Sequence, residues 1–122
     1  MRGALLVGID KYPQHAQLNG CVNDATELAV LLSHHEDGTR NFEIELQTNV
    51  PTRGALLDMI TRLFDAQLHT ALFYFSGHGI MTGRGGYIVT PDFNKYSEGI
   101  SMDEMLTIVN KSKITDKIVF LD

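Results

Sequence analysis

The chain has 122 residues, 43% of them hydrophobic, which fits one globular domain with its own core. A formal net charge of −5 and the lack of any Lys/Arg run argue against nucleic-acid binding, which needs a basic surface to neutralise phosphates. The single cysteine, Cys21, excludes an internal disulfide, and no apolar stretch approaches the roughly 20 residues of a membrane-spanning helix, so we expect a soluble cytoplasmic protein with no nucleic-acid or membrane partner.

The first strand and helix are predicted by a change of hydrophobic period. Residues 2–9 form an unbroken apolar run, which is typical of a buried strand, and residues 10–20 form a loop at its carboxyl end. Either Asn23 or Asp24 can cap the amino end of the helix that follows. The apolar residues of this helix lie on one face, namely Ala25, Leu28, Leu31 and Leu32.

Residues 34–64 predict another strand and another helix. A charged loop over residues 34–41 leads to residues 42–48, where apolar and polar residues alternate, as in a strand with one solvated face near a sheet edge. Pro51 opens the second helix. Its apolar positions repeat with helical spacing and are Leu56, Leu57, Ile60, Leu63 and Phe64.

Residues 70–79 contain the first candidate catalytic residue. Residues 70–75 form a nearly continuous apolar run, as in a central strand of a parallel sheet. The run stops at Ser76, and His78 follows between two glycines, where the backbone can turn sharply. Open parallel sheets place ligands and chemistry at the carboxyl ends of their strands, so His78 is a candidate catalytic residue. From these ten residues alone, a histidine that only caps a turn is an equal alternative.

The segment after His78 predicts a glycine-rich link, a short strand and a third helix. The strand covers residues 87–90 and ends at Pro91. Ser101 and Glu104 form a capping box for a helix that extends to about Asn110.

Residues 117–121 predict a final buried strand, after which Asp122 is the last residue. The order of strands and helices predicts right-handed crossovers and an α/β fold, with a mostly parallel sheet flanked by helices on both faces. A buried strand is normally followed by a segment that covers it. We therefore expect this fold to be incomplete at its carboxyl end.

Four ordered motifs are present: Ala4–Asp10, Leu18–Ala25, Phe73–Gly79 and Ile118–Asp122. This set resembles the large-subunit region of a caspase-like cysteine peptidase, closest to members of the bacterial metacaspase type. The resemblance covers nearly the whole chain and implies the caspase–haemoglobinase fold. Residues 1–122 are then the large-subunit part of one catalytic domain.

The resemblance also implies a catalytic arrangement. In that family Ser-Gly-His-Gly supplies the catalytic histidine, and the last strand leads into Asp-x-Cys, whose cysteine is the nucleophile. His78 then acts as general base and acid, and the backbone N–H of Gly79 donates to the oxyanion. Asp122 matches the aspartate, so the nucleophile is expected two residues beyond it. We expect this chain alone to be inactive, its partners being polypeptide substrates and the C-terminal small-subunit part of the same protein.

Substrate specificity is implied in the same way. Metacaspases have an acidic pocket for Arg or Lys before the cleaved bond, and the matching residues here are Asp24, Ser76 and Asp122. Two carboxylates that converge on one guanidinium favour bidentate pairing. The alternative for Asp24 is an aspartate that only stabilises the amino end of a helix.

We expect no metal and no cofactor. The remaining histidines lack ligand spacing for zinc, and many metacaspases have an acidic insertion where this chain has glycine-rich residues 83–87. Cys21 is expected to be a small buried residue and not the nucleophile. A second class of function stays open, namely an inactive caspase-like module for recognition or assembly. A residue other than cysteine two positions after Asp122 would indicate it.

Overall fold

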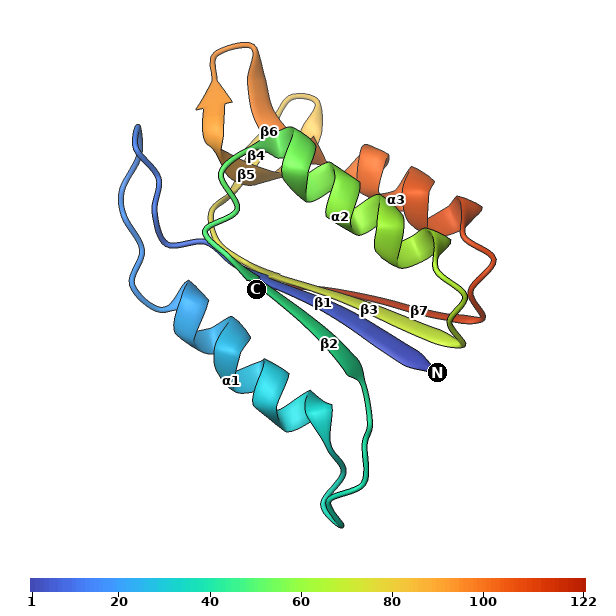
Figure 1. The fold of residues 1–122 in the computed structure, drawn as a ribbon. Coiled ribbons are helices and arrows are strands. Elements are labelled where there is room, and N and C mark those ends of the chain that lie inside the picture. The colour runs from blue at the N-terminus through green and yellow to red at the C-terminus, as the bar shows by residue number, and fades with distance from the viewer.

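The fold is built on a parallel sheet of four strands in the order β2-β1-β3-β7 (Figure 1). The computed structural model describes residues 1–122. The strands are β1 (Arg2–Gly8), β2 (Glu43–Thr48), β3 (Thr70–Ser76) and β7 (Asp116–Leu121). The predicted parallel sheet and the predicted edge position of the alternating strand are therefore confirmed.

Three helices cover the two faces of this sheet. They are α1 (Cys21–Ser33), α2 (Arg53–Asp65) and α3 (Met102–Lys111). α1 lies on one face, and α2 and α3 lie on the other (Figure 1). The predicted capping box of Ser101 and Glu104 opens α3. The expected α/β class with helices on both faces is confirmed.

The amino end of α1 is capped by a residue that is distant in sequence. The predicted caps, Asn23 and Asp24, are wrong, because the helix begins earlier, at Cys21. Instead, the Asp10 carboxylate accepts hydrogen bonds from the backbone N–H groups of Cys21 at 2.9 Å and Val22 at 3.3 Å. This contact from the preceding loop satisfies amide groups that the first helical turn leaves free.

Gly8 lets α1 approach the end of β1. A Cβ at residue 8 would overlap the carbonyl oxygen of Cys21 and would lie 2.9 Å from the Cα of Val22. We expect Gly8→Ala to lower the free energy of unfolding by roughly 1–3 kcal/mol, because the helix must move away from the sheet. Urea unfolding measures the change, and Gly54→Ala in α2 is the control, because its Cβ would meet nothing within 4 Å. Equal stability of the two variants would contradict this packing.

A small antiparallel sheet follows the carboxyl end of β3. Its strands are β4 (Gly79–Thr82), β5 (Gly85–Asn94) and β6 (Ser97–Ser101). The predicted strand over residues 87–90 lies within β5, but its predicted end at Pro91 is wrong, because β5 continues to Asn94. The predicted glycine-rich link is also wrong, because the glycines form part of a hairpin. Gly85 has a φ of +105°, which a hairpin turn accommodates. The pairing of β5 with β6 shifts in register between Val89 and Asn94, and this irregularity tolerates Pro91 within a strand.

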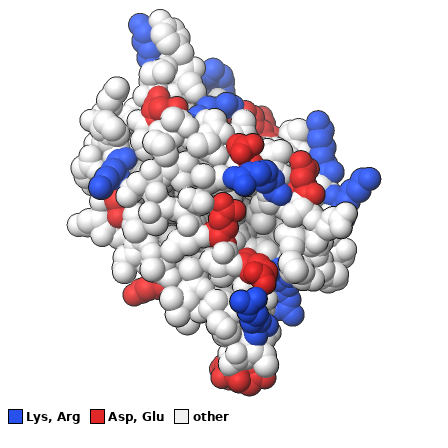
Figure 2. Space-filling model, viewed as in Figure 1, with Lys and Arg blue, Asp and Glu red and all other residues white.

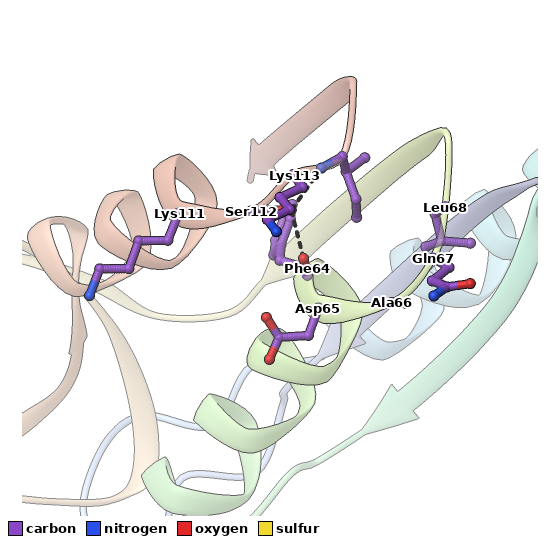
Figure 3. A pocket seen from close by; sticks show the side chains of 9 residues that line it. Phe64, Asp65, Ala66, Gln67, Leu68, Lys111, Ser112 and Lys113 are labelled. Atoms are coloured by element: carbon purple, nitrogen blue, oxygen red, sulfur yellow. Dashed lines mark hydrogen bonds between the residues drawn. The ribbon is translucent and has the colours of Figure 1, made fainter.

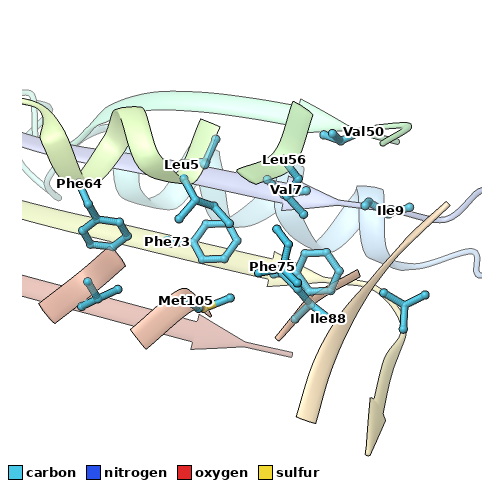
Figure 4. Close-up of a cluster of buried hydrophobic side chains, with 14 of the residues drawn as sticks. Leu5, Val7, Ile9, Val50, Leu56, Phe64, Phe73, Phe75, Ile88 and Met105 are labelled. Atoms are coloured by element: carbon cyan, nitrogen blue, oxygen red, sulfur yellow. The ribbon is translucent and has the colours of Figure 1, made fainter. Parts of the chain in front are cut away.

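Most of the core lies between the parallel sheet and the pair α2 and α3 (Figure 4). This larger cluster has 17 buried residues, among them Leu5, Phe73 and Phe75 of the central strands. The cluster under α1 has only five, among them Leu6 and Tyr74. Side chains of β1 and β3 alternate between the two faces, as the pleat requires. Tyr74 therefore faces α1, whereas its neighbour Phe75 faces the main core.

α1 covers its face of the sheet only in part. Its buried side chains are Ala25 and Ala29, which are small. Leu31, predicted to lie on the buried face, is 72% exposed, so the prediction is wrong at this position. Phe120 of β7 is also 56% exposed, so the prediction that residues 117–121 form a buried strand is wrong, because β7 lies at the edge of the sheet. Apolar side chains therefore remain accessible between α1 and the edge strand β7.

Charged side chains of both signs are interspersed on the face of the molecule in Figure 2. This face therefore has no basic stripe of the kind that phosphate contacts need. None of the three helices combines the length and the apolar character needed to cross a membrane.

Candidate active site

His78 lies at the carboxyl edge of the parallel sheet, between the end of β3 and the start of β4. Its side chain is half-buried. The loop of residues 10–20, which follows β1, covers the imidazole: the ring centroids of Tyr12 and His15 each lie 4.5 Å from that of His78. The sequence predicts that this loop and His78 share one edge of the sheet, and the structure confirms it.

A backbone carbonyl fixes the tautomer of His78. The Nε2 atom lies 2.7 Å from the carbonyl oxygen of Ala16. A carbonyl oxygen can only accept a hydrogen bond, so Nε2 carries the proton. In the neutral imidazole Nδ1 then holds a free lone pair, which is the form that can remove a proton from an acid. In the neutral form of His78, Nδ1 is therefore the nitrogen that can accept a proton.

The backbone N–H of Gly79 is turned away from the neighbouring strand. Val89 N–H donates to the His78 carbonyl oxygen at 2.9 Å, so these two residues form a hydrogen-bonded pair. Gly79 and Ile88 form the next pair along β4 and β5. Hydrogen-bonded and non-bonded pairs alternate in an antiparallel ladder, so Gly79 N–H points away from β5. Since β4 is the edge strand of its sheet, this donor is not used by strand pairing.

Asp122 lies beside the end of β3. β3 and β7 are parallel neighbours, and the backbone N–H of Asp122 donates to the carbonyl oxygen of Phe75 at 2.9 Å. The hydroxyl of Tyr74 donates to Oδ2 of Asp122 at 3.0 Å. Burial, together with this carboxylate, raises the pKa of Tyr74 to about 12, so the hydroxyl keeps its proton at neutral pH. Tyr74 therefore holds one oxygen of Asp122 and leaves the other free.

Two cavities meet at Asp122. The first, of about 520 Å³, is lined by His78, Gly79 and Asp122, with apolar side chains of β4, β5 and α3 on its other walls. The second, of about 490 Å³, is lined by Asp24, Glu27 and Asp122, with leucines of α1 and Phe120 on its walls. The structure thus brings Asp24 and Asp122 together. Of the two, only Asp122 also lines the cavity of His78.

Ser76, the third residue of the predicted acidic pocket, is 4% exposed and lines neither cavity. It follows Tyr74 by two residues on β3 and therefore faces α1, next to the Cys21 thiol. Burial raises the pKa of this thiol, against a smaller opposing effect of the Ser76 hydroxyl. A protonated thiol is a poor nucleophile. The side chains beside the Cys21 thiol are those of Ser76 and Asp10, and neither is a histidine that could act as its base.

The chain contains no group of three or more His, Cys, Asp or Glu side chains that could hold a metal ion. Asp92, which follows the glycine-rich segment, accepts hydrogen bonds from Arg53 N–H and the Thr90 hydroxyl. The Asp92 carboxylate therefore binds the backbone at the amino end of α2.

A further cavity, of about 360 Å³, lies at the other end of the sheet (Figure 3). It separates the carboxyl ends of α2 and α3, where the Ser112 hydroxyl donates to the carbonyl oxygen of Phe64 at 2.6 Å. Lys111 and Lys113 flank it, as basic residues commonly do at the negative ends of helices. We interpret this cavity as a junction between the two helices.

Sequence reasoning missed four contributors to the site: Tyr12, Ala16, Glu27 and Tyr74. Glu27 carries a usable signal, because it lies one helical turn after Asp24 and so shares its face. Tyr74 carries a weaker one, as a hydroxyl within an apolar strand whose buried group needs a partner. Ala16 contributes only a carbonyl oxygen, which every residue has, so no sequence signal could identify it.

Comparisons with known proteins identify the family of this chain. A family model described as Caspase domain matches residues 1–122. The chain is 38% identical over 87 residues to Metacaspase-1B of Aspergillus fumigatus, covering 64% of this chain and 21% of that protein. It is 34% identical over 127 aligned residues to Metacaspase-1 of Schizosaccharomyces pombe, covering 90% and 30%. The chain thus spans less than a third of either relative.

The fold and the family match describe the same domain. A parallel sheet with helices on both faces is consistent with the caspase–haemoglobinase fold. The match extends over all 122 residues, and so it includes both the histidine turn after β3 and the end of β7. This chain belongs to the caspase-domain family of cysteine peptidases.

Proposed function

We propose that this chain is the large-subunit part of a metacaspase-type cysteine endopeptidase that cleaves after Arg or Lys. His78 is the general base and acid, and the nucleophile is a cysteine two residues after Asp122. The observation that carries the proposal is the hydrogen bond from His78 Nε2–H to Ala16, because it leaves Nδ1 as a base at the carboxyl edge of the sheet.

The chemistry follows from the neighbouring positions of β3 and β7. Adjacent strands lie about 4.8 Å apart, so groups that leave their ends can come within hydrogen-bond reach. His78 Nδ1 takes the thiol proton, and the thiolate attacks the scissile carbonyl carbon. The amide N–H of Gly79 stabilises the oxyanion, and the proton on Nδ1 then passes to the leaving amine as the C–N bond breaks. Water hydrolyses the remaining thioester, with His78 again as base.

The cavity shared by Asp24 and Asp122 supports the specificity for basic residues. Its carboxylates can pair with a guanidinium or an ammonium group, while its leucine and phenylalanine walls suit the aliphatic part of an Arg or Lys side chain. Ser76 is buried and lies on the same face of β3 as Tyr74, which lines this cavity. Glu27 adds a third carboxylate at the same cavity.

We also propose that a small-subunit part of the same protein completes the domain. Support comes from β7, an edge strand on which Ile118, Phe120 and Leu121 are each more than 40% exposed. An apolar, unpaired edge strand favours addition of further strands. The two relatives named above are fungal, so the closer similarity to bacterial metacaspases stays a prediction, as does the cytoplasmic location.

The proposal predicts that the 122-residue chain does not cleave a fluorogenic Arg or Lys peptide, because Cys21 is its only thiol and is not paired with His78. A protein extended through the proposed nucleophile and the small-subunit part, called the extended protein below, should cleave the peptide, and Cys21→Ala should leave that rate within about twofold. Turnover by the 122-residue chain that Cys21→Ala abolishes would reject the proposed nucleophile. If the residue found two positions after Asp122 is Ser or Gly and the extended protein is inactive, the result would favour an inactive recognition module.

A further inference from the structure

The hydroxyl of Tyr12 lies between two backbone groups that would otherwise bond to each other. The N–H of His78 donates to the Tyr12 hydroxyl oxygen at 3.0 Å, and that hydroxyl donates to the carbonyl oxygen of Val89 at 3.1 Å. On the other side of the same residue pair, Val89 N–H donates directly to the His78 carbonyl oxygen at 2.9 Å. One of the two ladder bonds is therefore direct, and the other passes through a side chain.

We propose that Tyr12 is a positioning residue whose hydroxyl acts as a spacer between His78 and Val89, and so sets where the catalytic imidazole and the Gly79 amide lie. This inference rests on the proposed function. In a regular hydrogen-bonded pair both N–H groups bond directly to the opposite carbonyl. Here two hydrogen bonds in series occupy the place of one. The spacer therefore holds the start of β4 away from β5 on the side of the His78 amide.

The surroundings make the hydroxyl a fixed spacer. Tyr12 is fully buried, with 0% exposed. Burial raises its pKa to about 12, so at neutral pH the hydroxyl keeps the proton that it donates to Val89. The Tyr12 ring also packs edge-on against the imidazole of His78, at 61° between the ring planes. Tyr12 therefore contacts both the backbone and the side chain of His78.

Gly77 shows how closely the spacer fits. A Cβ at residue 77 would lie 2.6 Å from the Tyr12 hydroxyl and 2.7 Å from Cζ of Phe75. The glycine before His78 is thus needed to admit the hydroxyl, in addition to any turn that it allows. The loop after β1, the end of β3 and β5 are joined at this one group.

The first test is the kinetics of Tyr12→Phe in the extended protein. Removal of the hydroxyl lets the His78 N–H and the Val89 carbonyl close into a direct bond, which shifts the base and the oxyanion donor. A shift of about 1 Å can cost on the order of a hundredfold in rate, so we expect kcat to fall at least about tenfold. KM for an Arg peptide should stay within about twofold, because Asp24 and Asp122 are unchanged.

Tyr96→Phe is the matched control. Tyr96 is 80% exposed near the tip of the hairpin between β5 and β6, and its replacement also removes one phenolic hydroxyl. We expect its kcat and KM to equal those of the parent. If Tyr12→Phe keeps the parent's kcat, the positioning role is rejected.

The second test does not need activity and so remains valid if the proposed function fails. NMR scalar couplings across hydrogen bonds connect a donor ¹⁵N nucleus to the acceptor ¹³C′ nucleus. The parent should show the coupling from Val89 N to His78 C′ and none from His78 N to Val89 C′, whereas Tyr12→Phe should show both. If Tyr12→Phe does not fold, the parent spectrum alone decides. Couplings in both directions in the parent would show a direct bond from His78 N–H to the Val89 carbonyl, and would reject the proposal that the Tyr12 hydroxyl separates them.

Discussion

His78→Ala should abolish peptide cleavage by the extended protein while it leaves the fold intact. The expected loss in kcat is roughly 10³-fold or more, because the nucleophile loses the group that removes its proton and later protonates the leaving amine. The side chain is only half-buried, and its loss removes one hydrogen bond, to Ala16. Thermal unfolding should therefore change little. Initial rates with a fluorogenic Arg peptide measure the effect.

His35→Ala is the matched control for that experiment. His35 is an exposed residue in the loop between α1 and β2, at the far end of α1 from the site. We expect its rate to equal that of the parent. A His78→Ala protein with the parent's rate and normal unfolding would remove the catalytic role and leave His78 as a residue that only caps the turn after β3.

Asp122→Asn and Asp24→Asn should each reduce kcat/KM for Arg and Lys peptides by about ten- to a hundredfold. A charged hydrogen bond in a partly desolvated cavity contributes roughly 1.5–3 kcal/mol, which corresponds to that range. Peptides with a neutral residue before the cleaved bond should be affected much less, because they make no ion pair. The ratio of the two kcat/KM values is the informative measurement.

Glu36→Gln tests whether the loss of any negative charge has the same effect. Glu36 is exposed in the loop after α1 and lines neither cavity. We expect it to leave the Arg-to-neutral ratio unchanged. If Asp24→Asn cleaves Arg and Lys peptides as well as the parent does, or if the parent prefers Asp peptides, the acidic pocket is wrong and only the caspase-like fold remains.

The elements that could be predicted from the sequence are those determined by the hydrophobic pattern within one segment of the chain. Continuous apolar runs identify β1, β3 and β7, and helical spacing identifies the three helices. Because parallel strands share a carboxyl edge, the order of the strands also predicts that His78 and Asp122 lie at the same edge of the sheet. The contact between Asp122 N–H and Phe75 agrees with that prediction.

The elements that could not be predicted depend on contacts between distant segments. Asp10 caps α1 from outside the helix, and Tyr12 inserts its hydroxyl beside His78, 66 residues away in the chain. β4 is four residues long and begins at a glycine, so its pairing with β5 overrides its weak local preference for a strand. The tautomer of His78 depends on the backbone carbonyl of Ala16, a group that is the same in every residue type.

The most direct test of the central claim is the identity of the residue that an affinity label modifies. An Arg chloromethyl ketone, which alkylates an activated thiol near a bound basic side chain, should be incubated with the extended protein and mapped by peptide mass spectrometry. We predict a single adduct on the cysteine two residues after Asp122, formed much more slowly in His78→Ala. An adduct on Cys21, or no adduct on a protein that cleaves Arg peptides, would contradict the account.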